Sequence, residues 1–201
     1  LADYTPEVAT EILQDSAYFR FIVLREPLKR VVSGYLEKFV VNAPRPGEQG
    51  EPFNVIKRAI DWYYDRQGKT PDYASSISFN QFAEYLVQNR DEDLDTHFKG
   101  QKSYYQQQRF DFTGTIENLD STISMLESRF GQEIDPNLEQ RNRTKYRKPL
   151  FRRRDLGDLL PAQVRSLRKL PQAGELLTDE VAESLGERFS WDLKRWNDAN
   201  E

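Results

Sequence analysis

Apolar residues form a short unbroken run near the start of the chain and then recur at helical spacing. Residues 21–24 are all apolar (Phe-Ile-Val-Leu), which is typical of a strand buried on both faces of a parallel sheet. Pro27 follows after two residues, where a helix tolerates the missing N–H of proline. The apolar residues beyond it fall on one helical face: Val31, Val32, Tyr35, Leu36 and Phe39. The pattern predicts a strand, a tight turn and a helix.

Helical spacing and capping residues predict most of the other elements. The expected helices begin at Thr5-Pro6-Glu7, at about Phe53, at the capping box of Ser78 and Gln81, at Leu119, at Ala162 and at Thr178, the last continuing through Phe189 to Trp196. A second strand is expected at residues 110–113, with Gly114 breaking it. The acidic run 91–95 is interpreted as a solvated connector. Short buried strands among amphipathic helices predict an α/β fold.

Size and composition narrow the class of protein. The 201 residues suffice for one domain with a substantial core. With 29 basic and 33 acidic side chains the net charge is −4, so an anion site depends on local clustering. The lack of cysteine excludes disulfides, thiol catalysis and cysteine-ligated metals, and a single histidine argues against a conventional zinc site. With no apolar run of membrane-spanning length and no recognisable leader, we expect a bacterial cytoplasmic protein.

Arg25 and Ser33 are the first candidates for chemistry. Arg25 follows the predicted strand, and the carboxyl end of a strand together with the first turn of the next helix forms a natural anion site. Ser33 lies farther along the helix, on a face that an arginine at the turn can share. The alternative interpretation is an ordinary turn with a surface arginine and a solvated serine.

The joint pattern of Arg25-Glu26-Pro27, Arg30, Ser33 and Tyr35 resembles the 3'-phosphate-binding segment of carbohydrate-type sulfotransferases. Three later segments resemble the same family in the same order: residues 97–101 (His-Phe-Lys-Gly-Gln, with Gly100 in place of the usual proline), residues 110–119 and residues 189–193. The resemblance implies a helix-rich, P-loop-like three-layer sandwich with a short parallel sheet flanked by helices. It implies one sulfotransferase-like domain over residues 1–201.

The family's phosphosulfate-binding loop, which lies upstream of this segment, has no counterpart here. We therefore expect the first strand and loop to be missing from an N-terminally incomplete chain; the alternative is a protein that has lost the loop. The resemblance implies 3'-phosphoadenosine-5'-phosphosulfate (PAPS) as cosubstrate, with no metal. Arg25 and Ser33 would bind its 3'-phosphate, because a guanidinium makes forked, charge-assisted bonds to phosphate and a hydroxyl adds a neutral donor.

His97 is the candidate catalytic base, because sulfuryl transfer requires a group that takes the proton of the acceptor hydroxyl. The alternative is a structural or merely exposed histidine. The basic stretch 141–154 resembles the family's loop over the nucleotide, which would bring Arg143, Thr144 and Lys145 to phosphate oxygens. Charge runs are otherwise typical of solvated loops.

The expected function is transfer of a sulfuryl group from PAPS to an acceptor hydroxyl, in the first place on a carbohydrate. The expected partners are PAPS or its product PAP (3',5'-diphosphoadenosine) and that acceptor, without nucleic acid and without a membrane segment in this sequence. Two alternatives stay open: a catalytically silent nucleotide- or glycan-binding module, and a polyanion-binding protein that uses residues 141–154.

Overall fold

The computed structural model describes residues 5–43, 51–105, 108–134 and 155–201. The chain divides into two compact units. The first unit comprises Leu1–Glu26, Gln101–Glu139 and Trp191–Glu201, and the second comprises Pro27–Gly100 and Gln140–Ser190. Neither unit is one continuous stretch, because the chain leaves the first unit after Glu26, returns at Gln101 and returns again at Trp191.

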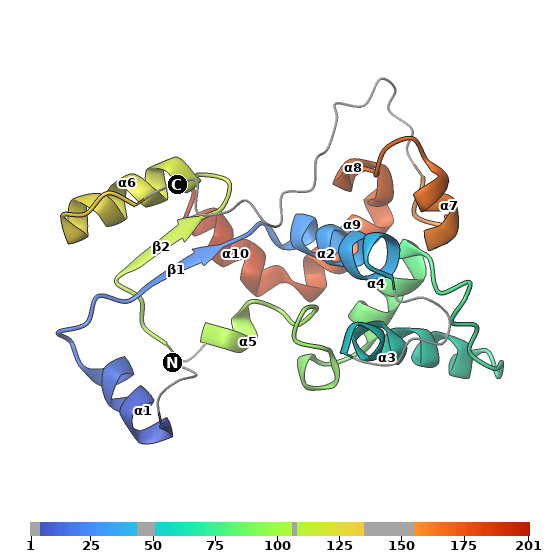
Figure 1. Cartoon of the computed structure of the whole chain (residues 1–201), viewed down its shortest axis with the longest axis horizontal. Helices are drawn as coiled ribbons and strands as arrows, with labels where there is room; N and C mark the ends of the chain where they lie inside the picture. The colour runs from blue at the N-terminus through green and yellow to red at the C-terminus, as the bar shows by residue number, and fades with distance from the viewer. Residues whose placement is uncertain (1–4, 44–50, 106–107, 135–154) are drawn as a thin grey trace. The chain divides into compact units, whose positions relative to one another are not determined.

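A parallel pair of strands forms the sheet of the first unit. Strand β1 (Phe21–Leu24) pairs with β2 (Phe112–Thr115) in a register that sets Phe21 opposite Phe112 and Leu24 opposite Thr115 (Figure 1). The same unit contains α1 (Pro6–Gln14), α5 (Lys102–Tyr105), α6 (Leu119–Phe130) and nearly all of α10 (Ser190–Asp198). The strand predicted at residues 21–24 is confirmed, and the helix-rich arrangement with a short parallel sheet confirms the α/β class.

Burial changes along β1, so the expectation of a strand buried on both faces is wrong at its beginning. Phe21 is 42% exposed, whereas Leu24 is 1% exposed. In the described residues β1 has one neighbouring strand, and the buried end is the one that leads into the turn before Pro27.

Gly114 lies inside β2 and does not break it, which corrects the predicted end of that strand. A Cβ atom at Gly114 would lie 2.5 Å from Thr122 Oγ1 and 2.6 Å from Thr122 Cγ2 on α6. The glycine is therefore required for the close approach of helix to strand. After Thr115, the Ile116 N–H still donates to the Leu24 carbonyl at 2.8 Å.

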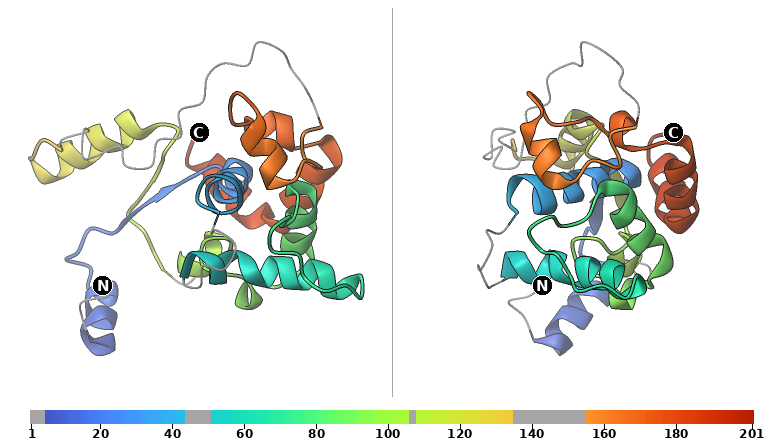
Figure 2. Two further views of the ribbon diagram at one scale, coloured as in Figure 1. Left: turned by 45° about the vertical axis from the view of Figure 1, so that its right-hand side comes forward. Right: turned by 90° about the vertical axis from the view of Figure 1, so that its right-hand side faces the viewer.

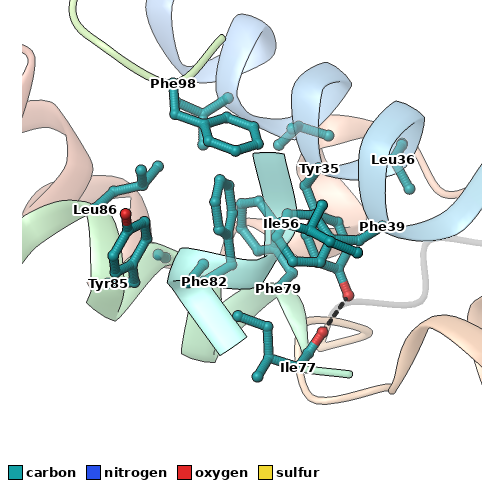
Figure 3. Close-up of a cluster of buried hydrophobic side chains, with 14 of the residues drawn as sticks. Tyr35, Leu36, Phe39, Ile56, Ile77, Phe79, Phe82, Tyr85, Leu86 and Phe98 are labelled. Carbon is teal, nitrogen blue, oxygen red and sulfur yellow. Dashed lines mark hydrogen bonds between the residues drawn. The ribbon is translucent and has the colours of Figure 1, made fainter. Parts of the chain in front are cut away.

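The second unit is built from helices around an aromatic core. Its elements are α2 (Pro27–Tyr35), the π-helical turn η1 (Leu36–Val41), α3 (Glu51–Arg66), α4 (Phe79–Gln88), η2 (Asp91–Asp93), α7 (Pro161–Ser166), α8 (Ala173–Leu176) and α9 (Asp179–Arg188) (Figure 1; Figure 2). The Tyr35 ring stacks on Phe39 with centroids 5.1 Å apart, and Phe82 meets Phe98 edge-on at 4.8 Å (Figure 3). The Tyr35 hydroxyl donates to the Ile77 carbonyl at 3.1 Å, which satisfies the one polar atom of this ring.

Local capping residues start the helices as predicted. Thr5 caps α1, Ser78 and Gln81 form the capping box of α4, and Thr178 caps α9. The single helix predicted from Thr178 to Trp196 is wrong: α9 ends at Arg188 and α10 begins at Ser190, with the buried Phe189 between them. The helix predicted to begin at Ala162 is α7, which begins at Pro161 and ends at Ser166.

The acidic run 91–95 is more than a solvated connector. Asp91 Oδ1 lies 2.6 Å from Arg188 Nη2, and Arg188 Nε also donates to the Leu86 carbonyl at 3.0 Å. Leu94 is 2% exposed. The run therefore links the end of α4 to the end of α9. Its acidic composition alone did not indicate these contacts.

Within the described stretches, no helix has the length and apolar character needed to cross a membrane. In the same stretches, no three histidine, cysteine, aspartate or glutamate side chains are grouped so that they could hold a metal ion. That residues 1–201 form one domain stays a prediction.

Candidate functional site

Arg25 stands at the carboxyl end of β1, as predicted, and its backbone is held by one side chain. The Arg25 N–H donates to Gln101 Oε1 at 3.0 Å, and Gln101 Nε2 donates to the Arg25 carbonyl at 2.8 Å. The Arg25 side chain is partly buried, and among the described residues its guanidinium has no hydrogen-bond or ion-pair partner. A partly desolvated cation at a strand end is suited to an anionic ligand.

Asp192, in the first turn of α10, anchors Gln101 in turn. Its Oδ2 atom accepts the Gln101 N–H at 2.6 Å and its Oδ1 atom accepts the Lys102 N–H at 2.7 Å. Asp192 is 2% exposed. A buried carboxylate needs such donors, because an unsatisfied charge in the interior is costly.

A second carboxylate holds the residue after Arg25. Glu117 Oε1 accepts the Glu26 N–H at 3.3 Å, and Glu117 Oε2 accepts the Trp196 indole N–H at 3.0 Å. The backbone N–H groups of Arg25 and Glu26 are thus both bound by side chains from later parts of the first unit. Glu117 is therefore a structural residue that joins the turn after β1 to α10.

Helix α10 and the residues just after it form a polar scaffold along β2. Arg195 Nη2 donates to Thr113 Oγ1 at 3.2 Å. Asn200 Oδ1 accepts both the Thr115 hydroxyl at 3.0 Å and Asn118 Nδ2 at 2.8 Å. The same helix carries Asp192, which binds the Gln101 N–H, and Trp196, which binds Glu117.

The second unit carries the other predicted residues. On α2, Arg30 Nη1 donates to the Lys99 carbonyl at 2.6 Å, and the Phe98 ring lies 3.4 Å from where a Cβ of Gly34 would be. These contacts fasten the segment around Phe98 to the helix that carries Ser33. The Ser33 side chain is partly buried, and in the described part of the chain its hydroxyl has no partner.

His97 forms a dyad with Asp95 in this segment. His97 Nδ1 lies 2.6 Å from Asp95 Oδ1, which also accepts the His97 backbone N–H at 2.9 Å. Burial raises the pKa of Asp95, but the hydrogen bonds from His97 outweigh burial and bring that pKa below its ordinary value. The His97 side chain is 47% exposed, and no described residue is bonded to Nε2. With Nδ1 bound to a carboxylate, Nε2 is the ring atom that can accept a proton.

The predicted site residues therefore fall into three groups. Arg25 belongs to the first unit, and Ser33 and His97 belong to the second. Arg143, Thr144 and Lys145, with the whole basic stretch 141–154, lie outside the described residues.

Sequence reasoning did not assign Gln101, Asp192 or Trp196 to the site. Gln101 and Asp192 occur in the segments 97–101 and 189–193 that carry the family resemblance, and this was the available sign. Their contacts with one another and with Arg25 join positions 76 and 91 residues apart, which local patterns do not reveal.

Comparison with known proteins assigns the family. The model of the sulfotransferase family matches residues 1–197. Carbohydrate sulfotransferase 14 of Homo sapiens is 32% identical over 131 residues, which is 63% of this chain and 32% of that protein. The zebrafish (Danio rerio) protein of the same name is 29% identical over 136 residues, covering 65% of this chain and 34% of the relative. The chain thus spans about a third of the length of these relatives.

Two further results complete the comparison. No solved structure shows a significant match. The expectation of a bacterial cytoplasmic protein is wrong, because the matched relatives are vertebrate carbohydrate sulfotransferases, including one from Mus musculus that is 31% identical. The match over residues 1–197, together with the motifs at the end of β1, shows that this chain belongs to the sulfotransferase family.

Proposed function

We propose that the chain is part of a carbohydrate sulfotransferase that transfers the sulfuryl group of PAPS to an acceptor hydroxyl. The proposal rests mainly on the environment of Arg25. Its guanidinium has no partner in the described residues, and the residue lies where a parallel strand ends. Membership of the sulfotransferase family and the carbohydrate sulfotransferases among its relatives support the donor and acceptor classes.

The binding role is assigned first to Arg25 and Ser33, which offer a cation and a neutral hydroxyl to the 3'-phosphate. Both groups fit a phosphate, because neither is bound by another described residue. Arg143, Thr144 and Lys145 are proposed to add contacts to the nucleotide phosphates. Their part of the proposal rests on the sequence.

The reaction requires in-line positioning and positive charge near the leaving phosphate. The acceptor oxygen bonds to sulfur as the bond from sulfur to the phosphate oxygen breaks, and the electron pair of that bond leaves with PAP. The acceptor proton goes to a base, for which we propose His97 Nε2. Asp95 fixes the ring by binding Nδ1.

Transfer of labelled sulfate from PAPS to desulfated polysaccharides tests this function. The wild type is expected to label a carbohydrate, and Arg25→Ala to lose most of the label at low PAPS concentration. Arg90→Ala is the matched control, since it also removes one cation but from a side chain that is 80% exposed. If the protein binds PAP tightly yet labels no carbohydrate, the silent binding module replaces the enzyme.

A further inference from the structure

We infer that Gln101 and Asp192 are positioning residues for the 3'-phosphate, because they fix the backbone from which the Arg25 side chain extends. The inference rests on the proposed function, in which Arg25 binds that phosphate. Neither residue needs to touch the ligand. Their role follows from a chain of hydrogen bonds that runs from Asp192 through Gln101 to Arg25.

The end of β1 determines the direction in which the backbone groups of Arg25 point. Its pairing with β2 continues as far as Leu24, whose carbonyl accepts the Ile116 N–H at 2.8 Å. In a parallel sheet, the N–H and C=O groups of successive residues point to opposite edges. The backbone groups of Arg25 therefore face the edge away from β2. There the Gln101 side-chain amide both accepts and donates, as a neighbouring strand would.

Gln101 is itself fixed. A glutamine side chain on a mobile backbone would lose much conformational freedom on making two bonds. Here its N–H is bound by Asp192 at 2.6 Å, and the adjacent Lys102 N–H is bound by the same carboxylate at 2.7 Å. Asp192 is 2% exposed, and burial strengthens such bonds because water does not compete for them.

The residues that form this chain of hydrogen bonds come from separate parts of the sequence. Arg25, Gln101 and Asp192 each lie within two residues of a point at which the chain passes between the units. Arg25 comes shortly before the passage at Pro27, Gln101 is the first residue after the return, and Asp192 follows Trp191, where the chain returns again. The hydrogen bonds within the first unit thus tie three separate chain segments together at one arginine. Glu117, from the same segment as Gln101, adds a further tie by accepting the Glu26 N–H.

The consequence is preorganisation of the phosphate-binding arginine. A side chain whose backbone is fixed in advance loses less entropy when it binds, so the affinity for its ligand rises without a new contact. Loosening the backbone should weaken binding of the 3'-phosphate and leave the rest of the nucleotide unaffected. A merely structural role would instead change stability without changing the preference for that phosphate.

The test compares PAP with AMP, which lacks the 3'-phosphate, by calorimetric titration of the full chain. Gln101→Leu removes both bonds to Arg25, and we expect it to lower the affinity for PAP about three- to tenfold while AMP binding is unchanged. Asp192→Asn leaves one acceptor oxygen for two N–H groups and should have the same direction of effect. Gln88→Leu, which removes an exposed amide in the second unit, is the matched control and should change neither affinity.

A double-mutant cycle separates positioning from direct contact. In an Arg25→Ala background, Gln101→Leu should leave the affinity for PAP unchanged, because there is no guanidinium to position. A further loss in that background would overturn the inference, and so would an unchanged ratio of PAP to AMP affinity in Gln101→Leu alone.

The inference and the proposed function fail differently. If the wild type binds PAP and AMP equally, the proposed function fails. If the wild type prefers PAP and only Arg25→Ala loses the preference, the positioning role alone fails. If Gln101→Leu does not fold, Gln101→Glu takes its place. This variant keeps an acceptor for the Arg25 N–H but loses the donor to the Arg25 carbonyl. If it retained the full preference for PAP, the positioning role of Gln101 would be overturned.

Discussion

At the scale of single residues, the Asp95–His97 pair has the geometry of a base and its orienting carboxylate. Asp95 binds Nδ1 of the ring at 2.6 Å and also binds the His97 backbone, so ring and chain are fixed by one oxygen. The same arrangement can be a local turn without function. The two interpretations predict different consequences for catalysis.

His97→Ala is expected to lower kcat by about 10²- to 10⁴-fold, the usual contribution of a general base, with KM for PAPS little changed. Asp95→Asn should lower kcat less, because the base stays present but loses its fixed orientation. Steady-state kinetics at saturating PAPS measures both. Near-normal turnover by His97→Ala would remove this histidine from the mechanism.

Asp95 also predicts a dependence of stability on pH. Its pKa in the folded protein lies below the ordinary value of 3.8, because the bonds from His97 outweigh the effect of burial. Its contribution to stability is therefore present above the unfolded pKa, complete by about pH 5, and is lost as the pH falls through the lower, folded pKa. Thermal unfolding between pH 5 and pH 3 should show a smaller loss of Tm in Asp95→Asn than in the wild type. An equal loss in both would contradict this assignment.

At the scale of elements, the contact of β2 with α6 depends on a glycine, Gly114, which has no side chain. Gly114→Ala would bring a Cβ to 2.5 Å from Thr122 Oγ1, so strand and helix would have to separate. We expect a loss of about 1–3 kcal/mol in the free energy of unfolding, the usual cost of overpacking. Urea denaturation measures it. Gly174→Ala in α8 is the control, since nothing lies within 4 Å of its Cβ position, and it should not destabilise the protein.

The elements that could be predicted from sequence are those whose causes are local. Thr5, Ser78 and Thr178 each cap a helix through an N–H three residues away, so the start of that helix is visible in a few letters. Gly114 was misread because its reason is a helix that begins five residues later and packs back onto the strand. The break at Phe189 was missed because the helical spacing continues across it.

The candidate site was predictable to a similar extent. Arg25 was found because it directly follows an apolar run, which is a local feature. The hydrogen bonds of Gln101 and Asp192 could not be predicted, because they join segments that come together only in the folded chain. Asp91 was misread for the same reason, since its partner Arg188 is 97 residues away.

At the scale of the whole molecule, the chain passes repeatedly between the two compact units. The passages after Glu26, after Gly100 and after Ser190 each fall within a segment that resembles the sulfotransferase family. Of the residues that sequence identified as functional, Arg25 lies beside the first of these passages.

This division predicts one cooperative unfolding transition. Neither unit is a continuous stretch of chain, so neither can complete its own contacts without the segments on both sides of the other. Differential scanning calorimetry should give a calorimetric enthalpy equal to the van't Hoff enthalpy, as for a single domain. Two resolved transitions would contradict the prediction that residues 1–201 form one domain.

The proposed function depends first on whether Arg25 binds the 3'-phosphate. Calorimetric titration of the wild type and of Arg25→Ala with PAP and with AMP measures this. We expect the wild type to prefer PAP and Arg25→Ala to lose about 1.5–3 kcal/mol of PAP binding, more than tenfold in affinity, while AMP binding is unchanged. Equal affinity of the wild type for the two nucleotides, or an Arg25→Ala protein that still prefers PAP, would show that Arg25 does not bind the 3'-phosphate.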